Sequence, residues 1–374
     1  MPTKRSVKRN GIKVEGVHGP FDALGIRGDR LGRHSEFGLY TREGLPIPAC
    51  DTAGNLFTSA PRAQYLSDAP VGEFVKPVLF AGLAPQQFGH VILNSLGRLW
   101  ALQYLPPDTA LLYLPRNQAN FAHYPFLKPI LELLSIKSRV LLHNEAMRYR
   151  SLYTSEDFFG ERHTGAMKAQ MRDWLWQRLP PTGPITKGRR VYLTRSQLGP
   201  KVGRYCNEEL IEHLLRADGY EVVAPERMSL PKQVALMQDA ETLVFAESSA
   251  LHLYGLVQRA GQRVGLIQRR NPLPQLMVGQ LRDGPADHYS IDAISKIYWP
   301  PQRQDNTSIA TLDFDILRDR LVAGRFLSPQ ARWREPYAPE VSASLHAGLA
   351  PGTRLIPDQQ RSDWLRARRR KSNA

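Results

Sequence analysis

The stretch that decides the fold reads VYLTRSQLGPKVGRYCNEELIEHLLRADGYEVVAPERMSLPKQVALMQDAETLVFAESSALHLYGLV over residues 191–257, and VGLIQ follows at residues 264–268. Short apolar runs predict strands, and segments of helical period between them predict helices. The predicted strands are 191–194, 220–224, 242–246 and 264–268, and the predicted helices are 207–217, 229–239 and 250–259. Strands and helices that alternate through short loops are typical of an open parallel sheet with covering helices.

The same alternation is present in the first half of the chain. Strands are predicted at 75–83, 110–114 and 139–143, and helices at 86–105 and 124–136. Residues 180–188, PPTGPITKG, are rich in Pro and Gly and predict a linker between two domains. The sequence therefore predicts an α/β protein of two Rossmann-like domains that face each other across a cleft.

Four segments follow from this division. We expect an N-terminal segment that wraps the surface, a first α/β domain, a second α/β domain, and a C-terminal extension with a basic tail. Their ranges are 1–74, 75–180, 189–325 and 326–374.

Length and composition exclude several classes of protein. The chain has 374 residues, of which 42% are apolar. This length is ample for two ordinary hydrophobic cores and too long for a single one. No run approaches the roughly 20 apolar residues of a membrane-spanning helix, and no apolar segment of a signal peptide follows the basic N-terminus. The only cysteines are Cys50 and Cys206, so a cytoplasmic protein without a disulfide framework is expected.

The net charge of +15 resembles that of a nucleic-acid-binding protein, but its distribution argues against one. Residues 1–13 and 361–374 together contribute +10, which leaves a mildly basic middle. Two interpretations of the basic ends stay open: solvated tails, or contact with an anionic surface. Trp364 and Leu365, which lie among arginines, would suit peripheral contact with the inner face of the cell membrane.

Polar side chains follow the predicted strands of the second half. In a parallel sheet, ligands bind beyond the carboxyl ends of the strands, where helix N-termini offer free N–H groups. Cations there would bind a diphosphate, and a carboxylate would bind ribose hydroxyls. The candidate donor-binding residues are Arg195, Lys201, Arg204, Asn207, Glu226, Ser248, Ser249 and His252. We expect Arg195 and Arg204 at a solvent-facing rim, although a solvated loop and a serine helix cap would also explain these residues.

An ordered set of motifs resembles glycosyltransferase family 61 over about residues 75–270. The matching positions are Phe88-Gly89-His90, Tyr192, Arg195, Arg204, Asn207-Glu208, Pro225-Glu226, Ser229-Leu230, Gln233, Ser249 and Leu251. The resemblance implies an inverting GT-B enzyme of the bacterial capsular or exopolysaccharide type that requires no metal. It would transfer a sugar from a nucleotide-sugar donor to a glycan or lipid-linked glycan acceptor. Residues 75–180 would then form the acceptor-side domain and residues 189–325 the nucleotide-sugar-binding domain.

Three positions depart from the family pattern. Glu247-Ser248 stands where His-Gly is usual, Asn94 where a Glu is common four residues after the helix His, and His252-Leu253 where Thr-Asn is usual. These departures leave open a second interpretation, in which the protein binds nucleotide sugars without catalysis. A nucleic-acid-binding protein is the less favoured third.

Inverting transfer requires a base for the acceptor hydroxyl and positive charge for the departing diphosphate. His90 is the expected base and Glu247 the rival, while Arg195, Lys201 and Arg204 would supply the charge. No dinucleotide, Walker or zinc-protease motif occurs, so neither a cofactor nor a metal is expected. Asp313-Phe314-Asp315 could bind a metal, but its place before residues 316–322 favours a helix cap.

Overall fold

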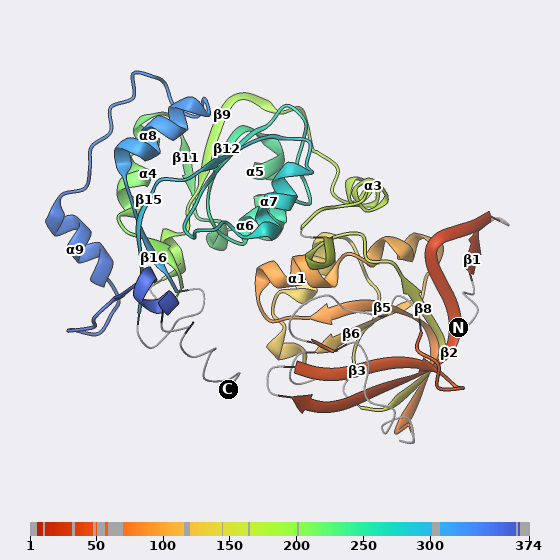
Figure 1. Ribbon diagram of the computed structural model, residues 1–374. Helices are drawn as coiled ribbons and strands as arrows, with labels where there is room; N and C mark the ends of the chain where they lie inside the picture. The colour runs from red at the N-terminus through yellow and green to blue at the C-terminus, as the bar shows by residue number, and fades with distance from the viewer. Residues whose placement is uncertain are drawn as a thin grey trace. The chain divides into compact units, whose positions relative to one another are not determined.

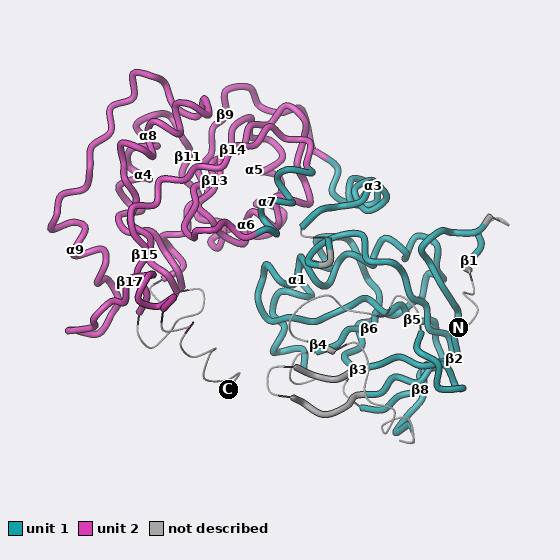
Figure 2. Tube along the Cα trace, in the orientation of Figure 1, with its two compact units in different colours: residues 1–180, 275–283 teal, residues 181–274, 284–374 magenta. Residues whose placement is uncertain are grey.

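The computed structural model describes residues 6–9, 12–31, 34–47, 50, 57–58, 70–115, 120–143, 145–163, 165–199, 202–300, 307–363 and 366. The chain divides into two compact units, which Figure 2 shows in different colours. Unit 1 contains Met1–Pro180 and Gln275–Asp283, and unit 2 contains Pro181–Pro274 and Gly284–Ala374. The first change of unit falls within the predicted linker. Helix α7 (Gln275–Arg282), which the sequence placed in the second domain, belongs to unit 1.

Unit 2 contains a five-stranded sheet whose paired strands are all parallel. Its strands are β9 (Thr186–Leu193), β11 (Glu221–Val223), β12 (Ala240–Ala246), β13 (Arg263–Ile267) and β14 (Asp287–Ile291). They are ordered β11-β9-β12-β13-β14, so the chain adds β11 on one side of β9 and β12 on the other. This reversal creates a topological switch point between the carboxyl ends of β9 and β12.

Helices cover both faces of this sheet (Figure 1). They are α4 (Glu208–Ala217), α5 (Leu230–Asp239), α6 (Ala250–Tyr254) and α8 (Phe314–Ala323). Val244 packs into the cluster with α4 and α8, whereas the ring of its neighbour Phe245 contacts Tyr254 of α6. Neighbouring strand residues point to opposite faces, so the two helical layers lie on opposite sides. The predicted alternation is confirmed, although α6 is shorter than 250–259.

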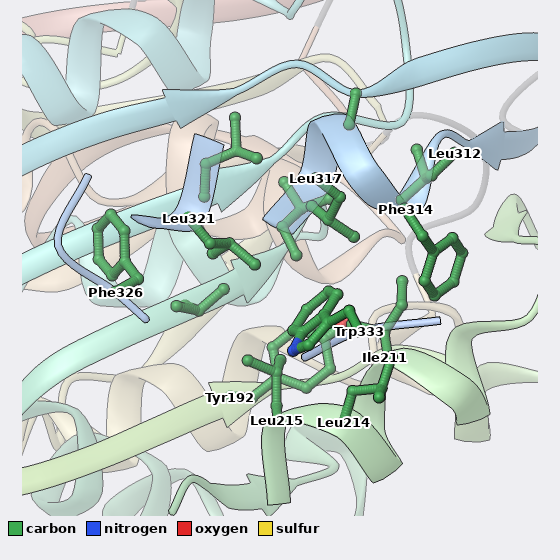
Figure 3. Close-up of a cluster of buried hydrophobic side chains, with 14 of the residues drawn as sticks. Tyr192, Ile211, Leu214, Leu215, Leu312, Phe314, Leu317, Leu321, Phe326 and Trp333 are labelled. Carbon is green, nitrogen blue, oxygen red and sulfur yellow. The ribbon is translucent and has the colours of Figure 1, made fainter. Parts of the chain in front are cut away.

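A buried apolar cluster fixes α4 and α8 against the sheet (Figure 3). It includes Ile211, Leu214 and Leu215 of α4, Leu317 and Leu321 of α8, and Tyr192, Phe326 and Trp333. Each large apolar side chain contributes roughly 1.5–3 kcal/mol on burial. The start of α4 is thereby held next to the end of β9, which is where the candidate site begins.

A second sheet in unit 2 was not predicted. Its order is β10-β16-β15-β17, with β10 (Arg204–Tyr205), β15 (Ile294–Trp299), β16 (Ile309–Leu312) and β17 (Ile356–Pro357). β10 is only two residues long and pairs with a strand a hundred residues later, so no local pattern marks it. Because β17 pairs with β15, residues 326–374 are not simply an extension beyond the second predicted domain, residues 189–325.

Unit 1 contains a mixed sheet of eight strands in the order β4-β3-β2-β8-β5-β6-β7, with β1 paired to β2. Strands β5 (Gly72–Ala84), β6 (Ala110–Pro115), β7 (Val140–Leu142) and β8 (Met147–Ser155) pair in parallel with one another. The three strands predicted at 75–83, 110–114 and 139–143 are confirmed. β8, an antiparallel neighbour of β2, was not predicted.

The expectation that residues 1–74 wrap the surface requires correction. The segment contains β1 (Ser6–Arg9), β2 (Ile12–Leu31), β3 (His34–Thr41) and β4 (Phe57–Thr58), and β2 lies inside the sheet between β3 and β8. Glycines, a proline and register shifts interrupt the alternation of β2 and conceal its buried residues. The antiparallel strands also make unit 1 a mixed α/β sheet rather than a Rossmann-like one.

The helix predicted at 86–105 is two shorter elements, α1 (Phe88–Ser95) and the 3-10 helix η2 (Leu99–Tyr104). The Ser95 hydroxyl donates to the carbonyl of Leu83 at 2.7 Å, and a Cβ at Gly97 would collide with Asp157. Unit 1 also contains α2 (Leu127–Leu133) and α3 (Ala169–Arg178). In the described part of the chain, no helix is long and apolar enough to cross a bilayer.

Candidate functional site

The candidate site in unit 2 lies past three neighbouring strands. Arg195 follows β9, Glu247 follows β12, and Arg269 and Arg270 follow β13. Phe245 pairs with Leu193 and Ala246 with Ile267, so the three strands end at the same edge of the sheet. This edge includes the switch point, the usual ligand position in an open parallel sheet.

Glu247 is completely enclosed by donors. Its side chain has 0% exposure, Oε2 accepts from the backbone N–H groups of Arg269 at 2.8 Å and Arg270 at 3.0 Å, and Oε1 forms an ion pair with Nε of Arg270. Nη2 of Arg269 lies 3.8 Å from the same oxygen. Both carboxylate oxygens are therefore occupied, which weighs against Glu247 as the base. In this structure it orients two arginines.

Arg195 is buried, not at the solvent-facing rim where we expected it. Its guanidinium donates to the backbone carbonyls of Glu247 and Gly203, and its backbone N–H donates to Glu208 at 2.8 Å. These bonds connect the loop after β9 with the end of β12. The guanidinium can be buried because these two backbone carbonyls accept its hydrogen bonds. No sequence pattern indicates that the carbonyls lie near Arg195.

Arg269 and Arg270 are the site residues that sequence reasoning missed. Arg269 is buried and donates to the carbonyl of Ser308 at 3.1 Å; burial, and then the charge of Arg195, lower its pKa to about 10. Arg270 remains 34% exposed, so its guanidinium is accessible to a ligand. Both directly follow the predicted strand 264–268, so their position past the end of a strand is the signal that marks them.

The charges and hydrogen-bond donors at this edge favour an anion. Three arginines stand against the carboxylate of Glu247 and the nearby carboxyl group of Glu208, whose pKa burial raises to about 7. Arg195 Nε, Arg269 Nε and Ser248 Oγ are buried atoms with no hydrogen-bond partner among the described residues. Buried donors are nearly always satisfied in native proteins, so these atoms indicate a missing acceptor. A diphosphate, with several acceptor oxygens and negative charge, has the chemistry that fits.

A second buried carboxyl group lies at the start of α4. Oε1 of Glu208 accepts from the hydroxyls of Tyr192 at 3.1 Å and Thr194 at 2.8 Å, and from the backbone of Arg195. Burial raises the pKa of Glu208 to about 7, against the lowering effect of these bonds. The Thr194 hydroxyl also lies 2.7 Å from Glu212 Oε1, and its one hydrogen cannot serve two carboxylates. A proton on one of the two carboxyl groups removes this conflict, in agreement with the raised pKa of Glu208.

Arg204 and Asn207 contact the C-terminal helix α9 (Ala338–His346). Nη2 of Arg204 donates to the carbonyls of Ser344, Leu345 and Ala347 at 3.3, 3.1 and 2.9 Å, and burial lowers its pKa. The backbone N–H of Asn207 donates to Ser344 Oγ at 2.8 Å. The half-buried Arg204 thus caps a helix in place of the expected open rim.

The remaining donor candidates are dispersed. Glu226 is exposed in a 3-10 helix after β11, which lies across β9 from β12. Ser249 is exposed just before α6, and His252 is buried within it. Lys201 lies outside the described residues. The edge therefore brings together Arg195, Ser248 and the missed arginines, but not Glu226.

His90 lies in the first turn of α1 in unit 1, with its side chain 44% exposed. Its Nδ1 is 3.4 Å from Asn94 Oδ1 and 3.8 Å from Glu161 Oε1. Glu161 was not singled out from the sequence, because 67 residues separate it from Asn94. An accessible imidazole beside a carboxylate is a suitable proton acceptor.

Within the described ranges, no group of three or more His, Cys, Asp or Glu residues could hold a metal ion. Asp313 of the Asp-x-Asp triplet caps α8, since its carboxylate accepts from the backbone of Ile316 at 2.8 Å. The predicted capping role is confirmed.

The comparison with known families agrees with the resemblance read from the sequence. The family model described as glycosyltransferase 61 matches residues 88–260. The matched region begins two residues before His90 and includes Arg195, Glu208 and Glu247, but ends before Arg269. It supports assignment to this family and a glycosyltransferase activity. No curated protein matches the chain.

Proposed function

We propose that the protein is an inverting, metal-independent glycosyltransferase of the GT-B type that uses a nucleotide-sugar donor. Unit 2 would bind the donor, and His90 is the proposed base. The observation that carries the proposal is the excess of arginine over carboxylate, with unsatisfied donors, at the switch point of a parallel sheet. The acceptor proposed is a glycan or lipid-linked glycan of bacterial capsule or exopolysaccharide synthesis, at the cytoplasmic face of the membrane.

The proposed reaction is a single displacement. The acceptor hydroxyl gives its proton to His90 while its oxygen attacks the anomeric carbon, and the bond from that carbon to the diphosphate breaks. The leaving diphosphate takes the electron pair and gains negative charge. Arg270, accessible and oriented by Glu247, would stabilise that charge because the arginine is already in place before the reaction. Attack opposite the leaving group inverts the anomeric configuration.

The test compares two arginines at opposite ends of β13. Arg270 follows the carboxyl end and is 34% exposed, while Arg263 begins the strand and is 33% exposed. A thermal-shift screen against UDP-, GDP-, CMP- and ADP-sugars identifies the donor. A ligand at a hundred times its Kd raises the free energy of unfolding by about 2.7 kcal/mol. Arg270→Ala should then weaken donor binding about 10- to 100-fold, because a charged hydrogen bond contributes roughly 1.5–3 kcal/mol.

Arg263→Ala should leave donor affinity unchanged. The melting temperature without ligand separates lost binding from lost stability, because Arg270→Ala also removes one partner of the buried Glu247. Equal donor affinities in the two variants would refute the placement of the diphosphate. Donor binding without hydrolysis or transfer would instead favour a catalytically idle nucleotide-sugar-binding protein, the alternative suggested by the departures at Glu247 and Asn94.

A further inference from the structure

Three polar side chains form a hydrogen-bonded chain in unit 1. His90 and Asn94 are four residues apart on α1, so they lie on the same face of the helix. Asn94 Nδ2 donates to Glu161 Oε2 at 2.7 Å, and Asn94 Oδ1 is 3.4 Å from His90 Nδ1. The Asn94 amide therefore lies between the imidazole and the carboxylate.

The donors and acceptors of this chain determine where the imidazole proton is. An ionised carboxylate only accepts hydrogen bonds, so the Asn94 amide must present its NH₂ group to Glu161 and its oxygen to His90. The amide oxygen also only accepts. His90 Nδ1 must then carry the hydrogen, which leaves the lone pair of the neutral imidazole on Nε2.

The turn that carries Glu161 is closely packed on α1. Gly160 has φ +104°, and a Cβ at this position would collide with the backbone of Leu93. The backbone N–H of His163 donates to the Gly160 carbonyl at 2.9 Å, and the His163 ring bonds the Asp157 carbonyl at 2.5 Å. This backbone fit sets the distance between Glu161 and α1, as a positioning group requires.

We propose that Asn94 and Glu161 are positioning residues that hold His90 in its Nδ1–H tautomer, with Nε2 as the proton acceptor. The catalytic consequence rests on the proposed function, whereas the tautomer does not. When Nε2 accepts the proton of the acceptor hydroxyl, the imidazole becomes positively charged. Glu161, whose Oε1 lies 3.8 Å from Nδ1, stabilises that charge without receiving a proton.

The test substitutes Glu161→Gln in the full chain. A glutamine amide can donate as well as accept, so the Asn94 amide can turn over and the tautomer of His90 is no longer fixed. We expect kcat to fall about 10- to 100-fold, part of the roughly 10²–10⁴-fold that a positioned base contributes, while KM for the donor changes little. Asn94→Ala should act in the same direction.

The matched control is Glu156→Gln. Glu156 also forms an ion pair at 3.8 Å, with Lys168, but it contacts neither His90 nor Asn94 in the described structure. The Glu156→Gln variant should therefore retain the kcat of the wild type. In a His90→Ala background, Glu161→Gln should have no further effect, because residues that act through one group are not additive.

A readout independent of activity is the ¹⁵N spectrum of labelled histidine, with the His90 signal assigned from His90→Ala. The wild type should show the Nδ1–H tautomer, and Glu161→Gln and Asn94→Ala a mixture. An Nε2–H tautomer in the wild type would overturn the proposal even in an active enzyme. An equal fall in kcat on Glu161→Gln in the wild type and in the His90→Ala background would also overturn the proposal. A wild type that transfers no sugar, yet shows the Nδ1–H tautomer, would refute the proposed function alone.

Discussion

Glu208 makes the stability of unit 2 depend on pH in an unusual direction. Its pKa is about 7 in the folded chain because the carboxyl group is buried, compared with 4.5 for an unperturbed glutamate. The folded state therefore binds more protons than the unfolded state between these pH values. The stabilisation is fully present below about pH 4.5 and is lost as pH rises through about 7.

The perturbation is Glu208→Gln, which removes the titration and keeps the size. From the two pKa values, the contribution of Glu208 to the free energy of unfolding should fall by about 2.5 kcal/mol between pH 5 and pH 8. The glutamine amide would place a donor where Oε2 has no partner among the described residues, which costs about 1–3 kcal/mol at every pH. The pH-independent cost and the pH-dependent term are therefore separable.

The assay is urea unfolding of both proteins at pH 5 and pH 8, followed by circular dichroism. Relative to the wild type, Glu208→Gln should be more destabilised at pH 5 than at pH 8, by about 2.5 kcal/mol. Glu209→Gln is the control, since this neighbour in the first turn of α4 is exposed. A difference between wild type and Glu208→Gln that stays constant with pH would refute the argument that burial keeps this carboxyl protonated.

Four other outcomes are expected. Turnover should survive excess EDTA, because arginines stabilise the leaving group in our proposal; loss restored by Mn²⁺ would contradict it. Deletion of residues 361–374, which carry a net charge of +5, should abolish binding to anionic liposomes and preserve turnover, and equal binding would indicate a solvated tail. Leu317→Ala should lower the free energy of unfolding by about 2–5 kcal/mol in urea, because Leu317 is fully buried. Arg204→Ala should accelerate hydrogen exchange in α9 and leave donor affinity unchanged; weaker donor binding would restore its predicted role.

The parts of the fold that were predicted depend on local patterns. The strands and helices from 191 to 268 have continuous apolar runs, helical periods and short loops, so each element is specified within its own residues. The parts that were missed depend on distant partners. β10 pairs with β16, and β2 pairs with β8 from more than a hundred residues away. Neither pairing leaves a periodic signal in the short or interrupted strand.

Residue type and position past a strand predicted where the candidate site lies, but not which arginine is accessible. Arg195 and Arg204 look alike in sequence, and both are engaged by backbone carbonyls that only the tertiary fold brings near. Sequence reasoning placed His90 at the start of a helix, and the structure agrees. Its partner Glu161 comes from a distant turn and could not be paired with it from spacing.

The departure at Glu247 has a physical consequence for the proposed donor site. A carboxylate at this position would repel a diphosphate if it were exposed. Here it is wholly buried and neutralised by Arg269 and Arg270, and its two accepted backbone bonds fix the turn that carries them. One buried negative charge thus holds two positive charges at the edge where a third, Arg195, already lies. The local charge remains positive, and the partly exposed Arg270 is the group best placed to contact an anion.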